Sequence, residues 1–112
     1  MKYALLVYVD PSSLDGMSDQ ERQALTAEYL EVREAPGVIG GDALQPIETA
    51  TTVRVSNGAT LTTDGPFADT KEILGGYYLL EADNLDQAIE TASKIPSTWM
   101  GGSVEVRPIV ER

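Results

Sequence analysis

Histidine and cysteine are absent from this 112-residue chain. Their absence removes thiol nucleophiles, imidazole acid–base catalysis, Ser-His-Asp triads, His-ligated haem and the common Cys/His zinc sites. Basic residues are also scarce, with eight Lys and Arg against eighteen Asp and Glu and a formal net charge of −10. Because phosphate binding needs clustered Lys and Arg, we expect neither nucleic acid nor an anionic membrane as a direct partner.

Long hydrophobic runs are missing too, and the most apolar stretch, at residues 2–9, is too short to span a membrane. This stretch lacks the small-residue cleavage pattern of a secretory signal, so we interpret it as a strand and expect a cytoplasmic protein. The length fits a single domain that covers residues 1–112. A hydrophobic content of 42% is ordinary for a folded domain, which argues against disorder despite the acidic charge.

Apolar spacing and capping residues predict two helices among several short strands. Ser18 and Glu21 fit a capping box, and Leu25, Tyr29 and Val32 follow at helical spacing. Strands are predicted where apolar residues alternate or run together between turn residues. The predicted helices are 18–34 and 85–95, and the predicted strands are 2–9, 38–44, 51–55, 59–63, 75–82 and 103–110.

The order of these elements indicates a fold class. Asn57-Gly58 predicts a hairpin, because both turn positions need positive φ. The remaining elements describe an α+β, ferredoxin-like sandwich with this hairpin as an extra. Two helices can cover only one face of its sheet, yet strands 2–9 and 75–82 are apolar on both alternations. We therefore expect a homodimer whose sheets pack face to face.

Several motifs resemble the YCII-related superfamily. The segment LTTDGPFADTKEILGG at 61–76 is similar to the signature of its DGPF branch. Supporting motifs are MKYALLVY at the start, GG-x-x-LQP at 40–46, TTVRV at 51–55 and GSVEVRP at 102–108. The resemblance runs nearly end to end and implies that the ferredoxin-like sandwich forms a dimeric α+β barrel. It also implies one of two roles, a small-molecule enzyme with a pocket inside the barrel or an accessory to sigma factors in transcription initiation.

Asp64 is the candidate catalytic residue. Other branches of the superfamily are thought to use a His–Asp pair, and since this chain has no histidine, the resemblance carries over only the aspartate of the DGPF motif. At a pocket mouth, Asp64 could act as a general base or a substrate anchor. The structural alternative is an Asx-turn, in which its side chain accepts backbone amides while Gly65 takes the extended conformation that Pro66 demands.

Four residues are candidates for substrate binding, namely Lys71, Arg107, Tyr8 and Tyr77. Lys71 would supply a cation near the DGPF motif, although loop lysines are mostly solvated. Arg107 shares a strand face with Glu105, so it would bind an anionic substrate inside the barrel or pair with that carboxylate. Tyr8 and Tyr77 offer hydroxyls from neighbouring strands, either as pocket lining or as core residues with satisfied hydroxyls.

Two functions therefore stay open at the level of sequence. In the first, a homodimer binds or transforms a small molecule, with Asp64 doing acid–base work beside a Lys, Arg or Tyr. In the second, the chain is a non-catalytic interaction module whose acidic surface contacts a protein such as a sigma factor. Neither hypothesis includes a cofactor or a metal, because the glycine pairs form no nucleotide-binding motif and the carboxylate pairs are explained as helix caps.

Overall fold

The computed structural model describes residues 1–67 and 70–112. Within these ranges the fold has two α-helices and six strands: β1 (Lys2–Val9), α1 (Asp19–Val32), β2 (Val38–Ala43), β3 (Thr51–Ser56), β4 (Ala59–Asp64), β5 (Ile73–Glu81), α2 (Leu85–Ala92) and β6 (Ser103–Pro108). The main sheet is antiparallel with the strand order β2-β5-β1-β6, and β3 and β4 form a separate hairpin. This is the predicted ferredoxin-like α+β arrangement with an extra hairpin.

The helices begin where local sequence places their caps. The capping box is formed, because the Ser18 hydroxyl accepts from the Glu21 amide at 3.1 Å and the Glu21 carboxylate accepts from the Ser18 amide at 3.2 Å. Asn84 caps α2 by accepting from the amide of Gln87 at 3.0 Å. The second helix ends earlier than predicted, since Ile95 precedes a proline and takes the extended conformation that such a position favours. Neither helix is long and apolar enough to cross a membrane.

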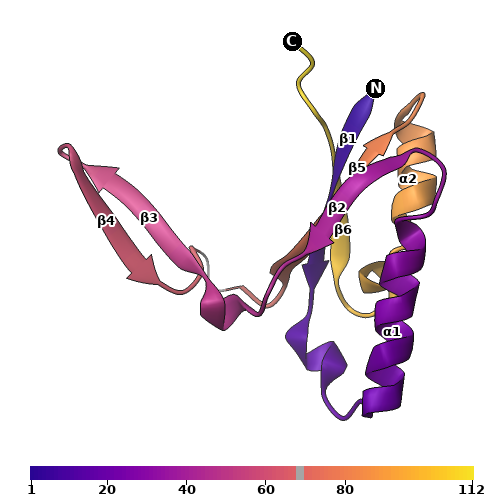
Figure 1. Cartoon of the computed structure of the whole chain (residues 1–112), viewed down its shortest axis with the longest axis horizontal. Helices are drawn as coiled ribbons and strands as arrows, with labels where there is room; N and C mark the ends of the chain where they lie inside the picture. The colour runs from indigo at the N-terminus through magenta and orange to yellow at the C-terminus, as the bar shows by residue number, and fades with distance from the viewer. Residues whose placement is uncertain (68–69) are drawn as a thin grey trace.

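The hairpin turn is confirmed by its backbone. Asn57 and Gly58 both have positive φ, at 51° and 78°, which suits a two-residue turn between twisted strands. Residues of β3 and β4 are exposed along almost the whole hairpin. In Figure 1 the hairpin projects from the main sheet on the side away from the helices.

The hydrophobic core lies between the main sheet and the two helices, which cover the same face (Figure 1). Its buried residues are Tyr3, Leu5, Val7, Val32, Tyr78, Leu80, Ala82, Ala88, Ala92 and Ile95. Val104 and Val106 of β6 pack against this core, as the alternation predicts. Burial of this apolar surface supplies most of the free energy of folding.

The opposite face of the sheet carries no helix (Figure 1). We call it the open face and define it by the residues that the strand register places on it, which are Lys2, Ala4, Leu6, Tyr8, Gly40, Asp42, Tyr77, Leu79, Glu81, Ser103, Glu105 and Arg107. Its central residues are only half-buried. Its charged residues lie on the edge strands β2 and β6 or, for Lys2 and Glu81, at strand ends, so the middle of the open face is uncharged.

Candidate functional site

The two helices approach the sheet differently. Over eight residues α2 buries Ala88, Thr91 and Ala92, whereas Val32, at the end of α1, is the residue that this longer helix buries. Leu25 and Tyr29, predicted to share an inner face with Val32, are half-buried. The earlier turns of α1 therefore stand off from the sheet.

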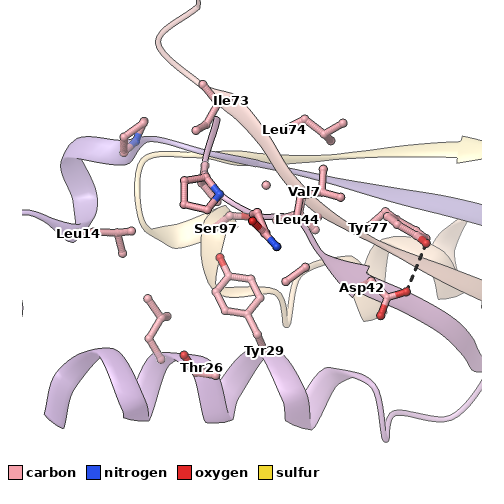
Figure 2. A pocket seen from close by; sticks show the side chains of 18 of the residues that line it. Val7, Leu14, Thr26, Tyr29, Asp42, Leu44, Ile73, Leu74, Tyr77 and Ser97 are labelled. Atoms are coloured by element: carbon pink, nitrogen blue, oxygen red, sulfur yellow. Dashed lines mark hydrogen bonds between the residues drawn. The ribbon is translucent and has the colours of Figure 1, made fainter. Parts of the chain in front are cut away.

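A cavity of about 600 Å³ fills the space that α1 leaves. Its walls come from α1, the end of β1 and the turn after it, the segment that follows β2, and the start of β5. Figure 2 shows Tyr29 rising from α1 toward the strands, with Leu14, Leu44 and Ser97 around it. We call this space the α1 cavity. Its apolar lining residues include Val7, Val9, Leu14, Leu25, Leu44, Ile47, Ile73 and Leu74.

Two hydrogen bonds hold α1 across this space. The hydroxyl of Tyr78 on β5 donates to the carbonyl oxygen of Tyr29 at 2.7 Å. Nearer the start of the helix, the Arg22 guanidinium donates to the carbonyl oxygen of Leu14 at 3.0 Å. These bonds join α1 to the turn after β1 and to β5, two parts of the cavity wall.

The tyrosines of the α1 cavity are hydrogen-bond donors rather than bases at neutral pH. Burial raises the pKa of Tyr78 to about 12, with a further contribution from Tyr29 and an opposing one from Arg33. Burial also raises the pKa of Tyr29, while hydrogen bonding with Ser97 opposes the rise. Both phenols therefore keep their protons.

Asp10 supplies a carboxylate at the rim of the α1 cavity. It accepts hydrogen bonds from the Ser12 hydroxyl at 2.7 Å and the Ser12 amide at 3.0 Å. These bonds, helped by Lys71, hold the pKa of Asp10 below its ordinary value of 3.8. Asp10 is thus ionised at neutral pH, and Arg22 and Arg33 add two guanidinium groups to the same lining.

The predicted catalytic residue, Asp64, lies at the end of β4, opposite Thr51, and is exposed. It lines neither the α1 cavity nor the second hollow described below. Its carboxylate makes no hydrogen bond to another residue in the two described ranges. Gly65 has a φ of 101°, so the prediction that this residue is extended is wrong. Its carbonyl accepts from Thr52 at 2.8 Å and its amide donates to Ala50 at 2.7 Å, and these bonds tighten the base of the hairpin.

Tyr8 and Lys71, two of the predicted substrate-binding residues, lie together. Both line a shallow hollow of about 470 Å³, here called the Tyr8 hollow, with Thr70, Glu72, Ser103, Val104 and Glu105 as its other lining residues. The Lys71 ammonium is 3.8 Å from the Asp10 carboxylate. This ion pair joins the Tyr8 hollow to the rim of the α1 cavity.

The other two predicted binding residues lie apart from this pair. Tyr77 lines the α1 cavity, and its hydroxyl donates to the Asp42 carboxylate at 3.5 Å, as the dashed line in Figure 2 marks. Arg107 is exposed on the open face and pairs with Glu105 at 3.6 Å. The structure therefore distributes the five predicted residues over the hairpin base, the Tyr8 hollow, the α1 cavity and the edge of the open face.

Sequence reasoning missed most of the cavity. Asp10, Arg22 and Arg33 are not among the residues that the sequence pattern predicts for a site. Tyr29 was predicted as an ordinary inner-face residue of the helix. A helical spacing identifies which residues share a face, but it does not tell how far that face stands from the sheet, so no local signal could have identified the cavity.

Comparisons with known proteins agree with the fold. The chain resembles the solved structure of 5-chloro-2-hydroxyhydroquinone dehydrochlorinase from Burkholderia phenoliruptrix AC1100, in complex with 2,5-dihydroxybenzoquinone, with a TM-score of 0.56. The match covers 100% of this chain and 96% of that one at 19% sequence identity, so it shows a shared fold.

A curated relative and a family model bear on the sequence itself. An uncharacterized protein of Rhizobium meliloti (strain 1021) is 39% identical over 117 aligned residues, which cover 97% of this chain and 92% of the relative. The model of the YCII-related domain matches residues 1–112. The chain therefore belongs to the YCII-related domain family.

Proposed function

We propose that this protein binds a small, largely apolar molecule with polar substituents in the α1 cavity, and that it works as a homodimer. The observation that carries the proposal is the cavity itself. Its volume of about 600 Å³ falls within the range of about 300–1,000 Å³ that is usual for small-molecule sites. An unfilled space lined by apolar side chains lowers the stability of a protein. A bound ligand that fills the space would offset this loss.

The lining indicates the chemistry of the ligand. Apolar side chains form most of the wall, and polar groups are few and placed around it. Tyr29 presents a phenolic hydroxyl, while Arg22 and Arg33 present guanidinium groups that favour an anionic substituent. A planar ring with hydroxyl or carboxylate substituents matches this set.

Support for a chemical transformation comes from the fold and from Asp64. The structural neighbour is a dehydrochlorinase, solved with a quinone. Asp64 remains our proposed acid–base residue, because the hydrogen bond from the Gly65 amide ties the hairpin base to Ala50, which follows the cavity-lining residue Glu48 by two positions in the chain. Lys71, close to Asp10 at the rim, is the cation that we propose to assist it.

Support for the homodimer comes from the open face. Ala4, Leu6 and Leu79 form an uncharged centre that is only half-buried in the single chain. Packing of two such faces would bury this apolar area and complete a dimeric α+β barrel. Tyr8 and Arg107 would then lie inside or at the edge of that interface.

Ligand binding is tested by protein NMR titration with a panel of hydroxybenzoates and dihydroxybenzoquinones. Thr26→Trp places a bulky ring in the α1 cavity, and Ala27→Trp adds the same ring at the next, exposed position, which does not line it. We expect the compound that binds best to lose at least tenfold in affinity with Thr26→Trp and to keep it with Ala27→Trp. Equal affinities of the two variants, or a panel without any binder, would overturn the cavity proposal.

The role of Asp64 is tested separately. Asp64→Asn keeps the shape of the side chain and removes its charge. We expect the variant to keep its fold and its dimeric state. Its turnover of the same compound, or its affinity for it, should fall at least tenfold. An unchanged response would remove Asp64 from the proposed machinery and leave the cavity proposal intact.

A further inference from the structure

We propose that the β3–β4 hairpin is an arm that grips a second copy of this chain, so that the dimer interface consists of the open face together with one face of the hairpin. The inference rests on the homodimer proposed above and adds to it the part played by residues 51–64. The proposed partner is a second, identical chain.

The hairpin has little support within its own chain. β3 pairs with β4 in a sheet of two strands, and an isolated two-stranded hairpin is at best marginally stable in water. Large apolar side chains on and beside it are strongly exposed, namely Val53 at 60%, Val55 at 69%, Leu61 at 51% and Phe67 at 76%. A surface of this kind is typical of a protein contact.

The exposed area of the whole chain points to a permanent partner. It amounts to 7780 Å², whereas a compact monomer of 12.1 kDa should expose about 6,000 Å². The excess of roughly 1,800 Å² matches what one subunit buries in a permanent homodimer, about 1,000–2,500 Å². The radius of gyration, 15.8 Å against about 13 Å for a compact domain of this length, agrees.

The placement of the hairpin indicates what it contacts. It projects on the side of the sheet away from both helices, which is the side of the open face (Figure 1). A second chain seated on the open face would therefore lie next to the hairpin. Two-fold symmetry would bring the hairpin of that chain against the first subunit in the same way, so each arm would close one edge of the dimer.

One face of the hairpin suits burial better than the other. The register places Val53 and Val55 on the same face as Thr62 and Thr60, and this row is uncharged as far as the base of the hairpin, where Asp64 pairs with Thr51. The other face carries Arg54, whose guanidinium lies 5.1 Å from the centroid of the Phe67 ring. In a chain with a net charge of −10, two copies meet at lowest cost through uncharged surfaces. We assign the valine face to the interface.

Matched substitutions test the arm by sedimentation velocity. Val55→Glu places a charge on the valine face, and Ser56→Glu places the same charge one residue later on the opposite face. We expect the wild-type chain to sediment at twice its 12.1 kDa mass at 10 µM. The dimer dissociation constant should rise at least tenfold with Val55→Glu and less than twofold with Ser56→Glu. Equal effects of the two substitutions would overturn the inference.

Removal of the arm is a second test. Because the Gly65 amide lies 2.7 Å from the Ala50 carbonyl oxygen, residues 51–64 can be replaced by two glycines without separating the ends. We expect a folded chain, by circular dichroism and cooperative unfolding, that is monomeric at 10 µM. If the shortened chain forms a dimer as tight as that of the wild type, the proposed role of the hairpin is overturned, but the homodimer is not. A wild-type chain that is monomeric at 100 µM would overturn the arm and the proposed homodimer together, while leaving small-molecule binding to its own assay.

Discussion

The phenolic hydroxyl of Tyr78 on β5 donates a hydrogen bond of 2.7 Å to the backbone carbonyl oxygen of Tyr29 on α1. This bond connects the sheet to the last turn of a helix whose earlier turns stand off from it, and both residues line the α1 cavity. The contact thus helps to fix the width of the cavity. Burial, the main cause of the raised pKa of Tyr78, keeps the hydroxyl protonated and therefore able to donate.

Replacing Tyr78 by Phe should have two measurable effects. At pH 8 the loss of one hydrogen bond should lower the free energy of unfolding by about 0.5–1.5 kcal/mol. At high pH the wild type should lose stability, because the pKa of Tyr78 is 10.0 in its ordinary state and about 12 in the folded chain. This contribution is complete below pH 10 and is lost as the pH rises through about 12.

Urea unfolding at pH 8 and pH 11 would check both effects. The decrease in stability between these values should be smaller in Tyr78→Phe than in the wild type. A part of the decrease should remain in the variant, because burial also raises the pKa of Tyr29. The same decrease in both proteins would contradict the proposed burial of the Tyr78 hydroxyl.

Acid stability should depend on Asp10. Its pKa is lowered chiefly by the Ser12 hydroxyl, then by the Ser12 amide, with a smaller contribution from Lys71. Stability from this carboxylate is present above its unfolded pKa of 3.8 and is lost as the pH falls through the lower folded value. Asp10→Asn should therefore flatten the loss of stability below pH 3.8. In thermal unfolding, Lys71→Ala should change this dependence less than Asp10→Asn, and the reverse order would contradict the assignment.

The described packing of the core can be checked by truncating one buried and one exposed leucine. Leu5 has no exposed surface, whereas Leu85, the first residue of α2, is 51% exposed. Leu5→Ala should lower the free energy of unfolding by about 2–5 kcal/mol, since it removes buried methyl groups and leaves a void. Leu85→Ala should cost less than about 1 kcal/mol. Denaturant unfolding with similar costs for both would contradict the described packing.

Local chemistry was sufficient to predict most of the elements. The Ser18–Glu21 capping box and the Asn57-Gly58 turn depend on side chains and backbone angles within a few residues, so the sequence specifies them directly. The two-face pattern of residues 2–9 likewise predicted a sheet with one face left open, since alternation along a strand reports which residues share a face.

The site was much harder to predict, because it depends on distances between elements. The spacing of Leu25, Tyr29 and Val32 places them on one face of α1, yet only Val32 is fully buried, and Tyr29 packs against the core half-buried. Asp10 and Lys71 are sixty-one positions apart in the chain and meet through the pairing of β1 with β5. Neither relationship leaves a periodic signal. The DGPF motif drew attention to Asp64, whereas the larger cavity is lined by other segments.

Gly41 tests how closely β2 must approach β5 along the wall of the α1 cavity. Its φ is 136°, and a Cβ at this position would lie 2.4 Å from the Tyr77 carbonyl oxygen and 2.7 Å from the Tyr78 Cα. Gly16 also has a positive φ, but nothing lies within 4 Å of an added Cβ there. Gly41→Ala should therefore lower the free energy of unfolding by well over about 1 kcal/mol, and Gly16→Ala by about that amount. Hydrogen exchange should show β2 opening more often in Gly41→Ala alone, and equal effects of the two substitutions would contradict the close approach.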